Sequence, residues 1–265
     1  MSKTKVFSII LQKGGVGKST LTFSLGAELA KKGYKVLLLD LDPSQGSLSQ
    51  LAHIDDADDR PGLADVMLSY TNNEKNKIEI KDVITPITEN LDICTVSIRL
   101  NGIDLQLSNV ISRETCLKRE LASTVEKDYY DFILIDNQPS LSLLPVNSLV
   151  ASDYVIIPCA LSYLSYRGLD LLKDTLDIVR DNLNNKLKIY GVIGTFKQHT
   201  NHSKEIEELI IKNEKFIASI PHSVVAQDFV YSFTDVTTYA PKSKVAKAYS
   251  NIADRLISDY EKSLI

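Results

Sequence analysis

The sequence predicts an α/β fold with a mostly parallel twisted sheet and helices on both faces. Short apolar runs rich in Val, Ile and Leu alternate with longer amphipathic segments, which is typical of parallel strands buried between helices. A glycine-rich loop follows the first apolar run, and aspartates close two later runs. Because ligands of open α/β sheets collect at the carboxyl ends of strands, these features also predict where a site lies.

The elements follow in chain order from this alternation. Strands are expected near 5–11, 35–40, 91–96, 131–136, 153–158, 188–195 and 216–220. Helices are expected near 18–32, 62–69, 103–126, 141–151, 165–183, 202–213 and 243–262. In the first helix Leu21, Leu25 and Leu29 recur at one-turn spacing, so we expect them to face the sheet. The polar stretch 55–82 is expected on the surface.

Composition places few limits on function. With 265 residues, 44% hydrophobic and 24% charged, residues 1–265 are expected to form one globular domain. The formal net charge of −4 gives no general attraction to nucleic acid or anionic lipid, so either would need a local basic patch. No apolar stretch approaches the ~18 residues of a membrane span, and no cleavage site follows the first strand. A cytoplasmic protein is therefore expected.

The three cysteines indicate neither a disulfide framework nor a zinc site. Cys94, Cys116 and Cys159 are scattered without C-x-x-C spacing and are expected to be buried thiols. His199 and His202 stand three residues apart, but no third ligand lies nearby, so a loop or helix-capping role is favoured over metal binding.

The glycine-rich loop, residues 13–20, follows the apolar run 6–11 directly. Its Gly-Lys-Ser end, residues 17–19, fits the pattern G-x-x-x-x-G-K-[ST], whose amides wrap phosphates while the hydroxyl binds magnesium. The first glycine of that pattern would fall at Gln12, and the loop carries the additional Lys13 instead. A plain glycine-rich turn is the alternative, disfavoured because a strand precedes the loop and a helix follows it.

Aspartates stand at the ends of two predicted strands. The run 35–39 leads into Asp40 and Asp42, and the run 132–135 leads into Asp136. Magnesium keeps most of its water and is held through few direct ligands, so one such carboxylate beside a phosphate loop is sufficient. The alternative for a strand-ending aspartate is a turn or helix N-cap.

The loop Lys-Gly-Gly-x-Gly-Lys-[Ser/Thr] resembles the deviant Walker A loop of the ParA and MinD class of ATPases. The likeness continues through 130–136, Pro139-Ser140, 153–158, 191–195, Ile220-Pro221 and 239–249. It implies a deviant Walker A P-loop NTPase fold with ATP and Mg²⁺ as cofactors.

The resemblance also implies roles for single residues. Lys13 is expected to cross a homodimer interface to the partner's nucleotide, Lys18 to bind the chain's own phosphates, and Asp42 to position the attacking water. The residues expected to contact the nucleotide are Gly14, Gly15, Val16, Gly17, Lys18, Ser19, Thr20 and Pro221. Those expected at or near magnesium are Ser19, Asp40 and Asp136.

Two segments depart from the family pattern. Ser44-Gln45 follows Asp42-Pro43, and Asn137-Gln138 follows Asp136, where the family commonly has Gln-Gly-Asn or Gln-Ala-Asn and Thr-Pro. Both lie beside the γ-phosphate in the expected fold. They bear on hydrolysis and its coupling to a partner rather than on nucleotide binding.

Other classes with this loop fit less well. A MinD-like membrane ATPase would have a basic amphipathic C-terminal helix, whereas the polar face of 253–265 is as acidic as it is basic. The glycine-rich cysteines of nitrogenase-type iron proteins and the C-terminal tyrosine cluster of bacterial tyrosine kinases are not found.

The short form of ParA is therefore expected, a nucleoid-associated ATPase that partitions plasmid or chromosomal DNA with a ParB-like partner. Its ATP-bound dimer would bind DNA nonspecifically through phosphate contacts. Candidate lysines are Lys197, Lys204, Lys212, Lys215, Lys242, Lys244 and Lys247, although any one of them could equally be a solvated surface lysine. The alternative is a MinD-like or other protein-positioning ATPase that acts on a cargo other than DNA.

Overall fold

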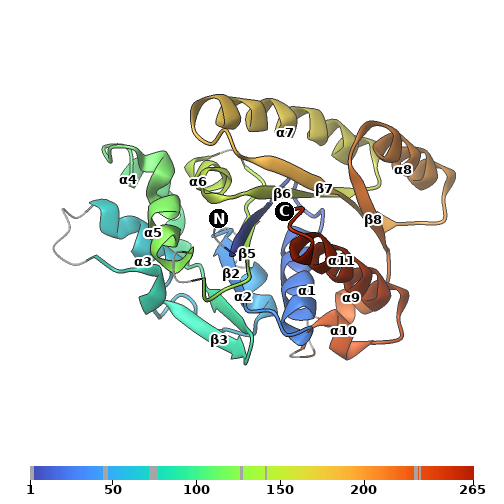
Figure 1. The fold of residues 1–265 in the computed structure, drawn as a ribbon, viewed down its shortest axis with the longest axis horizontal. Coiled ribbons are helices and arrows are strands. Elements are labelled where there is room, and N and C mark those ends of the chain that lie inside the picture. Colours follow the sequence, from blue (N-terminus) through green and yellow to red (C-terminus); the bar gives the residue numbers. More distant parts are fainter. Residues whose placement is uncertain are drawn as a thin grey trace.

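The computed structural model describes residues 3–43, 47–71, 77–125, 128–140, 142–229, 232 and 234–265. Its centre is an eight-stranded sheet in the order β3-β4-β2-β5-β1-β6-β7-β8 (Figure 1). The strands are β1 (Lys5–Ile9), β2 (Val36–Leu41), β3 (Ile84–Thr88), β4 (Leu91–Cys94), β5 (Phe132–Asn137), β6 (Tyr154–Ala160), β7 (Lys188–Lys197) and β8 (Phe216–Pro221). All neighbours pair in parallel except β3 and β4.

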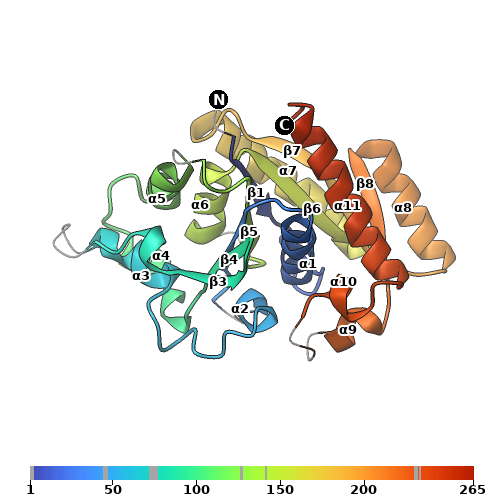
Figure 2. The same ribbon diagram turned by 60° about the horizontal axis from the view of Figure 1, so that its bottom comes forward.

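Helices cover both faces of this sheet, as the sequence predicts. The helices are α1 (Lys18–Lys31), α2 (Ser47–Leu51), α3 (Leu63–Leu68), α4 (Ile103–Gln106), α5 (Cys116–Val125), α6 (Leu143–Ala151), α7 (Tyr163–Asn182), α8 (Asn201–Asn213), α9 (Val225–Asp228), α10 (Val236–Tyr239) and α11 (Lys244–Glu261). In Figures 1 and 2, α1 and α11 lie together on one face, whereas α5, α6 and α7 lie on the other. The fold is therefore a three-layer α/β sandwich.

The core forms because the strands are apolar on both sides. Each residue of β2 is buried, as expected for a central strand between two helical layers. The predicted stripe Leu21, Leu25 and Leu29 is fully buried in the layer shared by α1 and α11. Gly26 lets α1 approach the sheet closely, since a Cβ there would lie 2.7 Å from the side chain of Leu38.

The predicted helix 103–126 is wrong as a single element. The described chain has α4, a 3₁₀ turn at Arg113–Thr115 and α5 in its place. Ser112 adopts a left-handed conformation with φ of 57°, which no helix can continue through. Amphipathic spacing on both sides of the break gave the appearance of one long helix.

Short elements account for most of the remaining differences. The edge strand β3 was not predicted, because its sequence Ile-Thr-Pro-Ile-Thr contains Pro86, which lowers any strand assignment. β3 runs antiparallel to β4, with a register shift between Pro86 and Thr88. Four short helices, α2, α4, α9 and α10, were also missed or merged. Helices of one turn carry too few residues to show a period.

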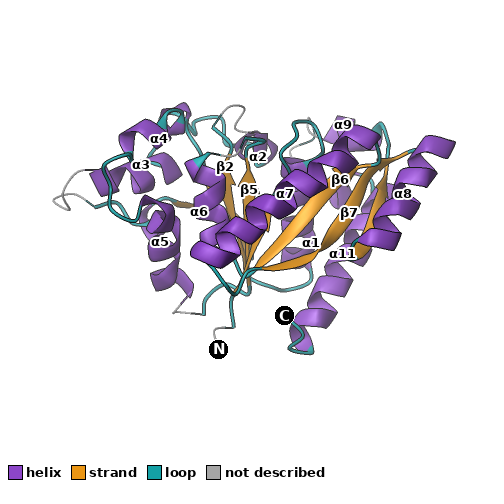
Figure 3. Cartoon of the chain, turned by 90° about the horizontal axis from the view of Figure 1, so that it is seen from above, coloured by secondary structure: helices purple, strands orange, loops and turns teal. Residues whose placement is uncertain are grey.

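The parallel strands bring their carboxyl ends to one side of the molecule. Figure 3 shows α2 and α9 on that side and both chain termini on the opposite side. β1, which leads into the phosphate loop, lies between β5 and β6 at the centre of the sheet. The loop and the strand-ending aspartates therefore meet at the same edge.

Candidate functional site

The phosphate loop connects β1 to α1 at the centre of the sheet. Gly15 and Gly17 have φ of 70° and 85°, a left-handed conformation that glycine adopts at little cost. The Thr195 hydroxyl donates to the carbonyl of Val16 over 2.8 Å and so fastens the loop to β7. The first turn of α1 starts at Lys18, so free backbone N–H groups and the positive end of the helix dipole face the loop.

A cavity of about 300 Å³ lies against this loop. Its lining is Gly14, Gly15, Gly17, Lys18, Ser19, Thr20, Asp42, Ser47, Gln50, Leu51 and Pro139. The cavity therefore brings the loop together with the predicted catalytic aspartate. A larger hollow of about 780 Å³ lies elsewhere, around Tyr70 and Arg119, and none of the predicted site residues lines it.

The two strand-ending aspartates, Asp40 and Asp136, are direct neighbours on paired strands. They stand opposite one another in the register of β2 with β5, and both are fully buried. Like charges across a strand pair repel, and burial disfavours ionisation of each. Such an arrangement is stable only where a proton or a cation occupies the space between them.

Asp40 is held by the segment that follows it. Its carboxylate accepts from the backbone N–H of Asp42 over 3.1 Å, and from the Ser49 N–H and hydroxyl over 3.0 and 2.8 Å. Burial raises the pKa of Asp40 to about 6, although these hydrogen bonds act in the opposite direction. Asp40 therefore sets the position of the Asp42 backbone and of α2.

Asp136 is the second buried acid, and the Ser19 hydroxyl lies beside it. Within the described chain neither of its carboxylate oxygens makes a hydrogen bond of normal geometry. Burial, followed by the charge of Asp40, raises the pKa of Asp136 well above its usual value, while the nearby Ser19 hydroxyl and Lys18 ammonium act to lower it. Buried polar atoms without partners indicate that a further group belongs there.

Magnesium fits this donor set. Carboxylate and hydroxyl oxygens are its preferred protein ligands, and it retains several waters. Among the described residues no group of three or more His, Cys, Asp or Glu side chains could hold a metal, so phosphate and water would complete its coordination. The residues placed to hold magnesium are Ser19 and Asp136, and Asp40 lies next to Asp136 on the neighbouring strand.

Lys18 brings a positive charge close to the buried aspartates. It is 6% exposed, and its ammonium donates to the carbonyl of Lys13 over 3.2 Å. Burial lowers the pKa of Lys18, whereas the charges of Asp136 and Asp42 raise it. A buried lysine within reach of a phosphate loop attracts anions strongly.

Five predicted residues do not line this cavity: Val16, Asp40 and Asp136, which are buried beside it, and Lys13 and Pro221. Lys13 is half-exposed and does not line it. Pro221 lines a separate hollow of about 440 Å³ with His222, Gln198 and Lys244. That hollow lies beyond β7, where the ring of Phe196 stands 6.2 Å from that of His222. The roles assigned to Lys13 and Pro221 stay predictions.

Of the two departures from the family pattern, only one can be described. Ser44, Gln45 and Gly46 lie outside the described residues. The Asn137 amide donates to the Ser8 hydroxyl and to the carbonyl of Ile9, at 3.0 and 3.1 Å. Asn137 thus ties β5 to β1 below the loop.

Sequence reasoning missed two residues that shape the site. Ser49 holds Asp40 from α2, and Thr195 holds the loop from β7. Ser49 lies 9 residues from Asp40, whereas Thr195 lies 179 residues from Val16, and neither residue carries a motif. The one signal that could have pointed to Thr195 was the Val-x-Gly-Thr end of the predicted strand 188–195, which is similar to the family.

Comparisons with known proteins agree with this geometry. The family described as AAA domain matches residues 4–189. The sporulation initiation inhibitor protein Soj of Bacillus subtilis is 35% identical, covering 96% of this chain and 99% of Soj. The chromosome partitioning protein ParA of Caulobacter vibrioides is 30% identical, covering 96% and 94%.

Solved structures share the fold over the whole chain. Cobyrinic acid a,c-diamide synthase of Mycobacterium smegmatis, with bound ATP analog and magnesium, has a TM-score of 0.83 at 29% identity, covering 98% of this chain and 97% of that one. A putative plasmid partition protein of Borrelia burgdorferi bound to AMPPNP has a TM-score of 0.78 at 26% identity, covering 97% and 99%. MinD of Pyrococcus horikoshii, at 23% identity and a TM-score of 0.77 with 96% of each chain covered, shows the fold alone.

Proposed function

The chain belongs to the ParA/Soj family of P-loop ATPases, and on that basis we propose that it binds ATP with Mg²⁺, dimerises around the nucleotide and segregates DNA. The observation that carries the proposal is the cavity of about 300 Å³ that joins the phosphate loop to Asp42. The buried carboxylate of Asp136, which makes no hydrogen bond of normal geometry in the described chain, supports magnesium beside the cavity.

Different residues would have different roles in ATP hydrolysis. The amides of the loop and the Lys18 ammonium would hold the phosphates, and Asp42 would accept a hydrogen bond from the attacking water and orient it. Bound magnesium would neutralise charge on the phosphate oxygens. Lys13, which is half-exposed outside the cavity, would reach the nucleotide of a second subunit. The dimer is thus the state in which charge stabilisation is complete.

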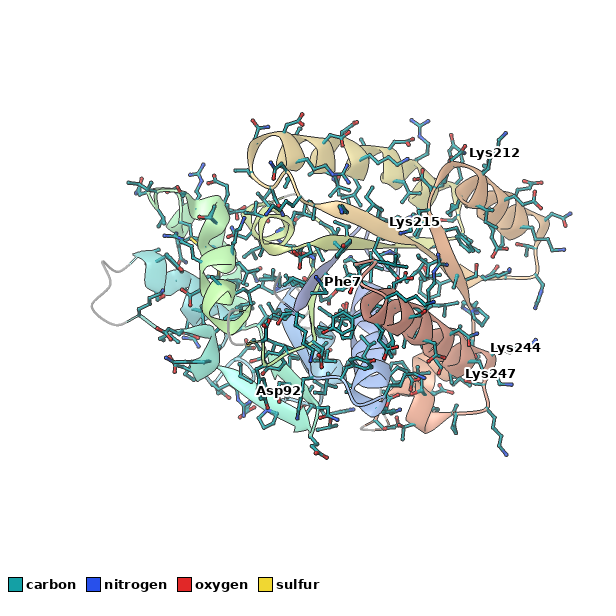
Figure 4. The ribbon with its side chains drawn as sticks, viewed as in Figure 1. Phe7, Asp92, Lys212, Lys215, Lys244 and Lys247 are labelled. Carbon is teal, nitrogen blue, oxygen red and sulfur yellow. The ribbon has the colours of Figure 1, made fainter. Side chains whose placement is uncertain are left out.

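The candidate DNA-binding lysines do not form one surface. β7 ends at Lys197 and α11 begins at Lys244, both on the side of the phosphate loop, whereas α8 ends at Asn213 and β8 begins at Phe216 on the opposite side. Lys212 and Lys215 therefore lie apart from Lys244 and Lys247, as Figure 4 shows.

The lysines on each side also differ in whether the side chain already has a partner. Lys197 lies 2.6 Å from the Glu207 carboxylate, and Lys215 lies over the ring of Tyr190. Lys204, Lys244 and Lys247 are exposed, on the side of the phosphate loop. We assign DNA contact to these three, since unpaired lysines release counterions from DNA without first losing a partner.

A membrane role receives less support. Along α11 the apolar residues Val245, Tyr249, Ile252 and Leu256 are buried against the domain, so this face is not available to lipid. No helix in the described part of the chain is long and apolar enough to cross a bilayer. The proposal therefore keeps DNA as cargo, a ParB-like protein as the activating partner, and residues 1–265 as one ATPase domain.

Equilibrium binding to nonspecific duplex DNA tests the proposal. We expect salt-sensitive binding with ATP, little binding with ADP or without nucleotide, and a dimer fraction by ultracentrifugation that rises in parallel. ATP-loaded dimers that ignore DNA would instead favour a protein-positioning ATPase. Monomers under saturating nonhydrolysable analogue would refute the dimer itself.

A further inference from the structure

A further hollow, called here the α2 hollow, lies across the short helix α2 from the nucleotide cavity. Its volume is about 440 Å³, and Gln50 of α2 lines both this hollow and the nucleotide cavity. Its other walls come from Pro43, from the segment 54–58 and from residues 96–98, which follow β4. One turn of helix therefore separates two cavities at the carboxyl ends of the strands (Figure 3).

A buried hydroxyl without a partner belongs to the wall of the α2 hollow. Ser97 lines the hollow and is 1% exposed. Within the described chain its hydroxyl makes no hydrogen bond. Buried polar atoms are nearly always paired, so an orphaned hydroxyl at a cavity wall indicates that a further polar group belongs there.

The rim of the α2 hollow is acidic. Asp55 and Asp58 both line it and are exposed. One carboxylate oxygen of Asp58 accepts from the backbone N–H of Ile98 over 2.8 Å, and a carboxylate has further lone pairs to offer. Neither aspartate has an ion pair with another described residue, and the neighbouring Arg60 lies 3.2 Å from Asp56 instead. The rim therefore carries negative charge that no described cation neutralises.

Apolar side chains form most of the remaining lining. They are Pro43, Ile54, Ala57, Val96 and Ile98. A cavity of this size with apolar walls and a few polar groups is typical of a site for a small organic molecule. No group of three or more His, Cys, Asp or Glu side chains in the described segments could hold a metal, so an inorganic cation is disfavoured.

We propose that the α2 hollow binds a small aliphatic amine. Its ammonium group would pair with Asp55 and Asp58 and donate to the Ser97 hydroxyl. Its hydrocarbon part would cover Ile54 and Val96. A phosphate or carboxylate would be repelled by the aspartates, and an uncharged alcohol would leave them unpaired. Charge and lining together therefore select a cation with an apolar stem.

Ser49 connects the α2 hollow to the nucleotide cavity. It lines the hollow, and its hydroxyl donates to Asp40 over 2.8 Å and accepts from the backbone N–H of Val96 over 3.4 Å. A bound amine would contact the helix that holds Asp40, and its positive charge would lie across α2 from the phosphates. Amine and ATP·Mg²⁺ should therefore each strengthen the binding of the other. This coupling rests on the function proposed above, whereas the amine site itself needs no nucleotide.

The experiment uses three probes with the same hydrocarbon chain, namely hexylamine, hexanol and hexanoate. Amide-detected NMR titration of the full chain without nucleotide measures their binding. The charge variant is Asp55→Asn with Asp58→Asn, and both replacements keep a side-chain oxygen, so the hydrogen bond at position 58 remains. The hydroxyl variant is Ser97→Ala. The control is Glu205→Gln with Glu208→Gln on the exposed face of α8.

We expect hexylamine to cause saturable amide shifts at Gln50, Ala57 and Ser97, with a Kd of about 0.1–1 mM. Hexanol should bind about fivefold more weakly or worse, and hexanoate should not bind. The charge variant should lose about fivefold or more in affinity for hexylamine, Ser97→Ala about threefold, and the control less than about twofold. Ser97→Ala should still unfold at the native urea concentration or above it, because its hydroxyl makes no hydrogen bond that the substitution would remove.

Equal binding of hexylamine and hexanol, native affinity in the charge variant, or shifts confined to other parts of the chain would overturn the proposal. With Mg²⁺ and a nonhydrolysable ATP analogue bound, hexylamine affinity should rise about threefold, and an unchanged affinity would overturn the coupling. A chain that binds hexylamine but not the analogue would refute the ATPase function and support the amine site.

Discussion

At the scale of single residues, the site is organised by two buried acids that differ in how they are satisfied. Asp40 accepts three hydrogen bonds from Asp42 and Ser49, whereas Asp136 has none of normal geometry in the described chain. The first residue therefore shapes the loop, and the second is suited to a cation. From the sequence alone the two aspartates look equivalent, because each ends an apolar strand.

Replacing Asp42 tests the assignment of the water-positioning residue. Asp42→Ala should retain ATP binding and dimerisation while steady-state ATP turnover falls about a hundredfold or more, because positioned general bases contribute that much. Phosphate release measured with saturating ATP gives the rate. Asp59→Ala, an exposed acid nearby, is the matched control. Near-native turnover in Asp42→Ala would remove the assignment.

Replacing Lys13 tests the role across the dimer interface. Lys13→Gln should remain monomeric with a saturating nonhydrolysable analogue, since the cation that would neutralise the partner's phosphates is gone. Sedimentation velocity reads this out, with the exposed Lys186→Gln as control. A Lys13→Gln protein that dimerises like the native chain would contradict the proposed cycle.

The raised pKa of Asp136 predicts how stability depends on pH. The folded chain holds this proton more tightly than the unfolded chain does, so the free energy of unfolding falls as the pH rises from about 4 through the folded pKa. Asp136→Asn carries no charge, and without nucleotide it should be more stable than the native protein by about 1–3 kcal/mol at pH 7.

Urea unfolding at pH 4 and pH 7 measures this difference, which should disappear near pH 4. Magnesium-dependent ATP binding should weaken in the same variant, since an amide binds the cation less strongly. An Asp136→Asn protein less stable than native at pH 7 would show that the carboxylate is compensated in the nucleotide-free protein.

At the scale of elements, the strands and helices with a clear hydrophobic period were predicted from the sequence, and the short elements were missed. The central strands and the long helices α1, α7, α8 and α11 follow from periodicity, because burial imposes a pattern on many residues at once. Helix α2, which carries Ser49, has one turn and no period. The break at Ser112 depends on a single backbone conformation, which sequence spacing does not record.

The cap of α10 can be tested at this scale. Asp235 accepts from the backbone N–H groups of Thr237 and Thr238, at 2.9 and 3.2 Å, and pairs with Lys31 of α1 at 2.8 Å. Asp235→Ala should lower the free energy of unfolding by about 2 kcal/mol through loss of the cap and the ion pair. The exposed Asp228→Ala at the end of α9 is the control.

The pH dependence of this variant has the opposite sign. Although burial alone would raise the pKa of Asp235, its hydrogen bonds to Lys31 and Thr237 bring it below the usual value. The stability it contributes is therefore present above pH about 4 and is lost as the pH falls. Thermal unfolding at pH 3 and pH 7 should show a smaller difference from native at pH 3 than at pH 7.

At the scale of the whole molecule, the lysines of α8 and α11 lie at one end of the sheet, although the two helices cover opposite faces. The lysines assigned to DNA lie on the side of the phosphate loop, at the start of α8 and α11.

Lysine substitutions test which end of the sheet contacts DNA. Lys204→Gln with Lys244→Gln and Lys247→Gln should weaken DNA binding by the ATP-bound protein and reduce the slope of log affinity against log salt by about 3 for each subunit that contacts DNA. The control is Lys212→Gln with Lys215→Gln on the opposite side, which should leave that slope nearly unchanged. Equal effects of the two sets would contradict the assignment.

The irregular strand β3 has a consequence for how the protein behaves at high local concentration. Pro86 gives no backbone N–H to an incoming chain, and the register shift beside it interrupts the ladder. Edge-to-edge pairing of this strand with a strand of another molecule is thus disfavoured. High local concentration can then be tolerated, and any filament that grows from here must be joined through side chains or nucleotide instead of a continuous backbone ladder.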